Sequence, residues 1–333
     1  LANNDTDSKI TGNVGGVTVG KIEFAGTKDV TFANNVTAQE DSKIEFSSSV
    51  ATTVKFSANA NTFGKAEFIG NENAIHTIDF GNNNITLEKA SAEATSKQLN
   101  FKVDAGKTIT IETAKSTGLN ITGGKLNMNK EGAIINSAGA SGGSGIKDIT
   151  FTKSGTIKAS AYAEDLTILD SQVASLGGTI SLSGNNGFKL SGGNSAVRFL
   201  DNATIDSTIK AGGNNYGNVT FEGNALISSA IGENSTTKVR TVTFSDKEGD
   251  IAQLYSNINA TSVNTKRGNI FIGRDVAINS GSINAASTTF DLNESTLSFN
   301  GGGDMTITGN NTINASVTNV SQKGEVEGGK ISV

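Results

Sequence analysis

A tripeptide of one apolar residue, one polar residue and phenylalanine recurs along the chain at intervals close to 22 residues. Alternation of apolar and polar residues is typical of a β-strand, whose side chains point to opposite faces in turn. Two such series are interleaved within each interval, and a third strand fits in the remainder. The phenylalanines that we expect to form buried ladders are Phe24, Phe32, Phe46, Phe56, Phe68, Phe80, Phe199, Phe221 and Phe244.

The chain has no proline among its 333 residues, although roughly 5% is usual in proteins. Proline cannot donate to a backbone ladder, so strands paired on both sides exclude it. A constant interval with strands paired on both sides predicts an all-β fold, a right-handed parallel β-helix with three sides and a coil of about 22 residues. A β-sandwich or barrel is the alternative, because short strands with regular turns also describe those folds.

We expect residues 1–333 to form a single β-helix with a less regular pattern in three regions. These regions are loop-like excursions near residues 86–98, 130–146 and 245–274. The first contains residues 87–94, a stretch that is rich in good helix formers and could form a turn or two of helix as an insertion at a corner. Solvated loops are the simpler interpretation of the other two. The sharper hypothesis is that loops held on a rigid scaffold carry binding residues.

Composition excludes several classes of function. The chain has no cysteine and a net charge of −5, which predicts neither a thiolate metal site nor a nucleic-acid binder. No apolar run is long enough to be a membrane span. The chain starts at Leu1 in a polar stretch and stops inside the repeat pattern, so we expect a mature fragment of a longer precursor.

Asparagine follows phenylalanine by three positions in several of the repeats. We expect these asparagines to lie in turns, where a positive φ angle costs them little. They are Asn35, Asn59, Asn71, Asn83, Asn202, Asn224 and Asn293. Phrases such as Val-Thr-Phe-Glu-Gly-Asn at 219–224 resemble the passenger domains of Gram-negative autotransporters, most of all the rickettsial surface-cell antigens of the outer-membrane protein B type. Phe-x-x-Asn also occurs in the chlamydial polymorphic membrane proteins, but only Gly132-Ala133-Ile134 matches their second motif.

This resemblance implies a virulence-associated adhesin or invasin that is displayed on the bacterial surface and secreted through its own translocator β-barrel. The implied location is extracellular, with a tether to the outer membrane in the precursor or after processing. The implied partner is a host-cell surface protein, or another copy of the chain on the bacterial surface. A polysaccharide-active β-helix enzyme and a purely structural, lattice-forming coat are the alternatives.

The residues needed for catalysis are sparse. His76 is the only histidine, and we expect it to point outward into solvent, opposite Ile75, rather than to act as a base. Candidate carboxylates for a polysaccharide enzyme are Asp246, Glu248 and Asp250, or Asp201 and Asp206, but there is no tryptophan and only three tyrosines to stack on sugars. We therefore predict no enzyme activity and no cofactor.

Residues 301–304, Gly-Gly-Gly-Asp, are a single weak match to a calcium-binding repeat, so we predict no metal site. Lys266, Arg267 and Arg274 could form a small basic patch, although a solvated face is the simpler interpretation. These three residues are the only candidates for partner contacts that the sequence offers.

Overall fold

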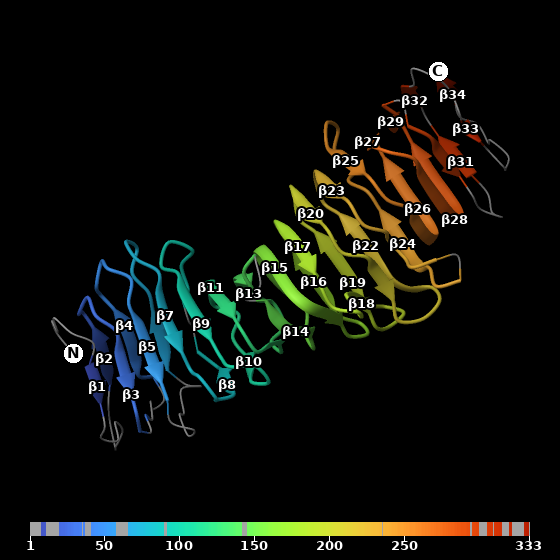
Figure 1. The fold of residues 1–333 in the computed structure, drawn as a ribbon. Coiled ribbons are helices and arrows are strands. Elements are labelled where there is room, and N and C mark those ends of the chain that lie inside the picture. The colour runs from blue at the N-terminus through green and yellow to red at the C-terminus, as the bar shows by residue number, and fades with distance from the viewer. Residues whose placement is uncertain are drawn as a thin grey trace. The chain divides into compact units, whose positions relative to one another are not determined.

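The computed structural model describes residues 20–34, 36, 41–57, 66–89, 92–141, 145–234, 236–293 and 295–299. It also describes the backbone of β1 (Ser8–Ile10), β31 (Met305–Thr308), β32 (Asn310–Asn314), β33 (Val320–Ser321) and β34 (Lys330–Ser332). Between residues 20 and 299, the described ranges form further β-strands joined by turns (Figure 1). Within the described ranges, no helix is long and apolar enough to cross a membrane.

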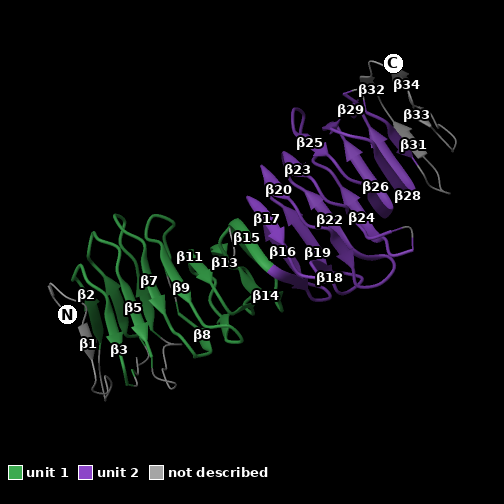
Figure 2. Cartoon of the chain, in the orientation of Figure 1, with its two compact units in different colours: residues 1–163 green, residues 164–333 purple. Residues whose placement is uncertain are grey.

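The chain divides into two compact units, Leu1–Ala163 and Glu164–Val333 (Figure 2). Strand β15 (Gly155–Ile168) begins in the first unit and ends in the second. Each unit is built from strands that stack in parallel on the strand one coil away. Each unit can therefore be described as three stacks of strands, one for each side of the coil.

In the first unit, one stack contains β1, β3 (Val30–Phe32), β5 (Thr53–Phe56), β7 (His76–Asp79), β9 (Leu99–Lys102) and the end of β11 (Ser116–Thr122). A second stack contains β8 (Ile85–Leu87), β10 (Thr108–Ile111), β12 (Lys125–Met128) and β14 (Ile146–Phe151). The third contains β2 (Lys21–Phe24), β4 (Lys43–Phe46) and β6 (Glu67–Ile69), and the start of β11 pairs with β13 (Ala133–Ala138).

In the second unit, one stack contains β16 (Val173–Leu176), β19 (Ala196–Phe199), β22 (Tyr216–Phe221), β24 (Val239–Thr243), β26 (Ile258–Lys266), β28 (Val276–Ala286) and β31. Another contains β17 (Thr179–Leu182), β20 (Ala203–Ile205), β23 (Ala225–Ile227), β25 (Ile251–Leu254), β27 (Asn269–Ile272), β29 (Thr289–Asp291), β32 and β34. The third contains β18 (Phe188–Leu190), β21 (Ile209–Ala211), the bridging residue Ile231, the first residues of β26 and β28, then β30 (Leu297–Phe299) and β33.

The prediction of a parallel β-helix is confirmed, with one turn of the solenoid for about 22 residues. The register explains the spacing found in the sequence, because equivalent residues of successive coils lie side by side. Phe32 is paired with Phe56, and Phe199 with Phe221. A β-sandwich or barrel of antiparallel strands is not what the chain forms.

Phenylalanine side chains fill the interior of both units. All nine of the ladder phenylalanines are buried, with exposed fractions of 4% or less. The rings of Phe199, Phe221 and Phe244 stack with successive centroid separations of 5.2 and 5.3 Å. Since aromatic rings bury large apolar areas, each coil adds one apolar layer over the last.

The turn asparagines serve in more than one way. Asn202 and Asn293 have φ angles of 62° and 41°, the left-handed region that asparagine enters at low cost. Asn83 donates its amide to Phe80 O, and Asn71 donates to Ser47 O one coil away, at 2.6 and 3.1 Å. The amide oxygen of Asn224 accepts the Ile251 N–H of the next coil. Asn35 and Asn59 lie outside the described residues.

Strands run through two of the three regions that the sequence sets apart as excursions, since 130–146 include β13, and 245–274 include β25, β26 and β27. Within 86–98, only Thr86 and Leu87, at the end of β8, are in a strand among the described residues. The repeat is hard to see there because phenylalanine is scarce, as in β26, where Val263 and Thr265 point inward. The stretch 245–250 remains outside the strands and joins β24 to β25.

Candidate functional site

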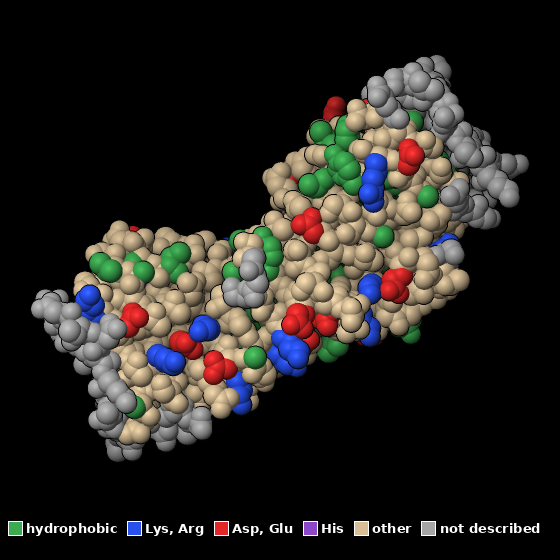
Figure 3. Space-filling view, in the orientation of Figure 1, with side chains coloured by type: hydrophobic (Ala, Val, Ile, Leu, Met, Phe, Trp, Pro, Cys, Tyr) green, Lys and Arg blue, Asp and Glu red, His purple; other side chains and the backbone are tan. Residues whose placement is uncertain are grey.

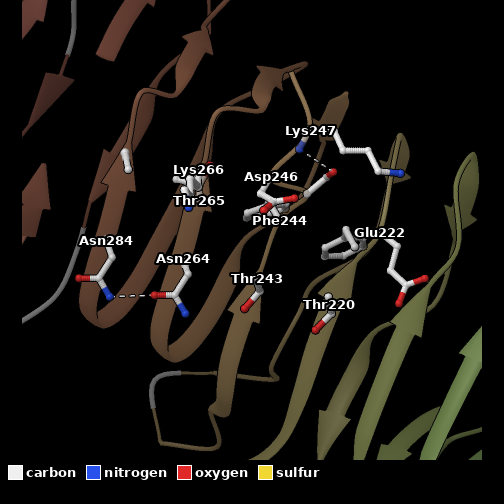
Figure 4. Close-up of a pocket in the computed structure, with 13 residues that line it drawn as sticks. Thr220, Glu222, Thr243, Phe244, Asp246, Lys247, Asn264, Thr265, Lys266 and Asn284 are labelled. Atoms are coloured by element: carbon white, nitrogen blue, oxygen red, sulfur yellow. Dashed lines mark hydrogen bonds between the residues drawn. The ribbon is translucent and has the colours of Figure 1, made fainter. Parts of the chain in front are cut away.

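A half-open groove lies on the outer surface of the second unit, across strands β22, β24, β26 and β28 (Figure 4). Its volume is about 640 Å³, within the range of about 300 to 1,000 Å³ typical of small-molecule sites. It follows the end of each strand, so every coil contributes residues at the same corner. The lining residues are Thr220, Phe221, Glu222, Thr243, Phe244, Ser245, Asp246, Lys247, Asn264, Thr265, Lys266, Asn284 and Ala286.

An uncharged polar ladder forms one side of the groove. Thr220 is in register with Thr243, Thr243 with Asn264, and Asn264 with Asn284. Neighbouring strands lie about 4.8 Å apart, so a hydroxyl or amide recurs along the groove at that interval. The Asn284 amide donates to the Asn264 amide oxygen at 2.8 Å, which fixes the orientation of both side chains (Figure 4).

The apolar ladder changes in size beneath the groove. Phe221 and Phe244 stack on each other, but the next residue in the same register is Thr265, which pairs in turn with Ala285. The buried Thr265 hydroxyl lies 3.1 Å from the Thr288 hydroxyl. A small void of about 10 Å³ is lined by Phe244 and Thr265 among others. The groove thus lies where large side chains give way to small ones.

The segment 245–250 follows β24 and forms a wall of the groove with its first three residues, Ser245, Asp246 and Lys247. The Ser245 hydroxyl donates to the Asp250 carboxylate and accepts the Lys247 N–H. Gly249 has a φ angle of 92°, a conformation that other residues rarely adopt. The hydrogen bonds of Ser245 therefore stabilise this shape of the wall, and the glycine allows the backbone to adopt it.

Four charged side chains line the groove, two of each sign. Glu222 lies 3.7 Å from Arg198, and Asp246 lies 3.8 Å from Arg267. Neither Lys247 nor Lys266 has an ion pair with a carboxylate among the described residues. Lys247 is near enough to Asp201 to contribute, after the amide hydrogen bonds from Asn224 and Asn202, to a lowered pKa of that carboxyl. Lys266, the other lysine of the groove, does not contribute to this shift.

The three basic residues singled out in the sequence do not come together at one place. Lys266 and Arg267 precede β27, and Arg274 follows it. A strand of this length spans about 13 Å, so Arg274 belongs to a different corner. Lys266 lines the groove, whereas Arg267 has a φ angle of 59° and donates its N–H to Ala286 O.

The candidate carboxylates lie apart in two groups. Asp246, Glu248 and Asp250 belong to the segment 245–250, and of these three only Asp246 lines the groove, whereas Asp201 and Asp206 flank the short strand β20. Backbone and side-chain N–H groups hold the pKa of Asp201 below its usual value, and the Asp206 carboxylate accepts the Ser228 hydroxyl at 2.8 Å. Among the described residues, no group of three or more histidine, aspartate or glutamate side chains is placed to hold a metal ion.

The prediction that His76 points outward is wrong. Its side chain is fully buried, whereas Ile75 is 46% exposed. His76 and Ile75 do point to opposite faces of the strand, as expected, but His76 is the residue that points inward. It shares the inner face with the buried Ile78, two residues later. The alternation counted back from Ile78 was the signal that could have placed this histidine.

Sequence reasoning also missed most of the groove. Thr220 and Thr243 are the central residues of Val-Thr-Phe tripeptides, so their outward direction could be read from the repeat. Asn264 could not be aligned with them, because Thr265 stands where phenylalanine was expected. The wall formed by residues 245–250 depends on contacts that no repeat encodes.

Acidic and basic side chains are interspersed over the face in view, among backbone and uncharged side chains (Figure 3). In the described part of the chain, several charged side chains form pairs between adjacent coils, such as Lys21 with Glu45 and Lys125 with Asp148. The sequence matches no family model, and no curated protein or solved structure is detectably similar to it. The fold and the groove are thus the basis for a functional proposal.

Proposed function

We propose that this chain is a binding scaffold displayed on a bacterial surface, an autotransporter passenger that acts as an adhesin or invasin on a host-cell protein. The groove with its wall at residues 245–250 is the observation that carries the proposal. A rigid stack of strands that presents an irregular segment at one corner is the usual arrangement of a binding loop on a scaffold. In the full-length precursor a translocator β-barrel would tether this passenger to the outer membrane.

The proposed role is non-enzymatic, and the state of the carboxylates supports it. A general acid for glycosidic bonds needs a raised pKa. The Asp201 carboxyl instead has a lowered pKa, caused by hydrogen bonds from Asn224 and Asn202. Asp250 is engaged by Ser245, and Asp246 lies close to Arg267. These partners fit carboxylates that stabilise turns.

The scaffold also suits exposure to the extracellular medium. The chain has no cysteine, so its stability comes from burial and strand pairing without any disulfide. Among the described residues, this burial and pairing are seen in the phenylalanine ladders and in the strands that pair between coils. Such a chain can present the same corner repeatedly and hold it rigid against a partner.

Binding of the fluorescently labelled chain to cultured host cells tests the proposal. Residues 245–250 would be replaced by a two-residue Asn-Gly turn, and the matched control would replace residues 183–187, the corner between β17 and β18. We expect saturable binding that is at least tenfold weaker after the first replacement and unchanged after the second. Absence of saturable binding by the folded chain would contradict the proposal, and self-association into ordered arrays without cell binding would favour a structural coat.

A further inference from the structure

The groove in the second unit combines an apolar interior with charged side chains, of which the two lysines lack an ion pair among the described residues. Thr220, Thr243 and Ala286 contribute methyl groups, and Phe221 and Phe244 lie beneath them. An apolar pocket of this size with a few convergent polar groups is the usual form of a site for a small organic ligand. The groove is therefore suited to a ligand with a compact apolar body.

The charged side chains around the groove indicate which sign of charge the polar end of such a ligand should carry. Both carboxylates of the groove have an arginine partner: Glu222 lies near Arg198, and Asp246 lies near Arg267. Lys266 is exposed, lines the groove and has no ion pair among the described residues. An anion bound beside Lys266 would gain a charge-assisted hydrogen bond without displacing an existing partner.

The polar ladder supplies neutral hydrogen-bond groups next to this lysine. Asn264 precedes Lys266 by two residues on β26, so both side chains leave the same outer face of the strand. The Asn264 amide oxygen accepts from Asn284, and the Asn264 N–H groups have no acceptor among the described residues. Lys266 and the Asn264 amide together offer donors to the two oxygens of one carboxylate.

We propose that this groove binds small amphipathic carboxylates, molecules with an apolar ring or chain and one anionic group. The apolar body lies over the Thr220 to Ala286 side chains, and the carboxylate lies beside Lys266 and Asn264. This site goes beyond the proposed adhesion, because it rests on the groove alone and holds whether or not the chain binds cells. Its occupancy is a property of the isolated protein in solution.

A pair of probes that differ only in charge tests this proposal. The fluorescence of 2-naphthoate can be followed without interference, since the chain contains no tryptophan. We expect saturable binding of 2-naphthoate to the full chain and about fivefold weaker binding of the neutral 2-naphthamide, a ratio that corresponds to about 1 kcal/mol, the upper end of the range for an exposed ion pair. Absence of saturable 2-naphthoate binding, or equal affinities for the two probes, would overturn the proposal.

Variants locate the site. Lys266→Met should weaken 2-naphthoate about fivefold and leave 2-naphthamide unchanged, whereas Lys189→Met, at an exposed position on β18 in the same unit, should change neither. Thr243→Glu places an anion in the groove and should weaken 2-naphthoate further, with Thr204→Glu on β20 as its matched control. Both target positions face outward, so circular dichroism should show folded variants. If either control weakens 2-naphthoate as much as its target variant, the ligand lies elsewhere and the assignment to this groove is wrong.

Discussion

The His76 ring stacks on the Phe46 ring with a centroid separation of 5.0 Å and an angle of 28° between the ring planes. Phe46 stacks in turn on Phe24, so a histidine takes the third place in a series of aromatic rings. Its Nδ1 lies 2.9 Å from the Thr52 hydroxyl and 3.3 Å from Thr52 N, and its Nε2 lies 3.0 Å from Ser48 O. These partners fit the neutral ring, with Nε2–H as donor and Nδ1 as acceptor.

Acid should therefore destabilise the first unit through His76. Burial lowers the pKa of this ring below its usual value of 6.5, and its neighbours Phe46, Ser48 and Thr52 are uncharged. The unfolded chain binds the proton more readily than the folded chain, so the stabilisation is complete above about pH 6.5 and is lost as the pH falls toward the folded pKa. Urea unfolding at pH 7 and pH 5 measures the difference.

The variant His76→Phe separates this effect from other titrations. It should reduce the difference in unfolding free energy between pH 7 and pH 5. At pH 7 it should cost about 1 to 3 kcal/mol, because Thr52 N–H and Ser48 O lose their partner. An unchanged pH dependence in this variant would show that the histidine is not the titrating group.

Phe221 should be worth more to stability than Phe244. Phe221 has a stacked ring on both sides, Phe199 and Phe244, whereas Phe244 has a ring on one side and Thr265 on the other. Phe221→Ala should cost about 3 to 5 kcal/mol, and Phe244→Ala should cost less, since solvent can fill the space from the groove. Thermal unfolding of both variants, with the outward Thr220→Ala as control, checks this order, which an equal loss for both would contradict.

An asparagine network stabilises the first unit near β11. The Asn120 amide group donates to the side-chain oxygens of Gln98 and Asn100, both at 3.1 Å, and its oxygen accepts from Asn136 and Ser137. Asn120→Asp replaces the donor by an acceptor that faces those two oxygens. We expect a loss of about 1 to 3 kcal/mol at neutral pH, measured by urea unfolding.

The exposed turn residue Asn214 provides the control for that change. Asn214→Asp alters the net charge by the same amount, and it should change stability by less than about 0.5 kcal/mol. Equal losses in the two variants would mean that charge alone, and not the network around Asn120, accounts for the effect.

Backbone conformation at Asn202 gives a separate prediction. Its φ angle of 62° is costly for a β-branched residue, so Asn202→Val should lose about 1 to 2 kcal/mol. Asn202→Gly should retain wild-type stability within about 0.5 kcal/mol. Thermal unfolding of the pair distinguishes backbone strain from loss of the amide, since both variants remove the side-chain amide but only valine adds strain.

The fold could be predicted from the sequence because the β-helix repeats its register. Once Phe32 and Phe56 occupy the same place in successive coils, the tripeptide alone gives the strand, its inward face and its neighbour. The prediction failed where a residue departs from the repeat. His76 fills a place in an aromatic stack that phenylalanine usually takes, and the phase of its strand had to be counted from Ile78.

The groove could be predicted only in part. Lys266 was a candidate because it was expected to form a basic patch with Arg267 and Arg274. That patch does not form, since Arg274 lies at another corner, and Lys266 lines the groove instead. The depth of the groove depends on the change from Phe244 to Thr265 and on the Ser245 hydrogen bond that holds its wall. Such features come from contacts between coils, and the period of the sequence does not record them.

The most direct measurement of the proposed function is hydrogen exchange of the chain bound to host-cell membranes. We predict slower exchange on binding in residues 220–222, 243–250, 264–267 and 284–286, the four segments that surround the groove, and no change in the first unit. Protection confined to the first unit, or no protection in any of these four segments of a chain that binds, would contradict the account.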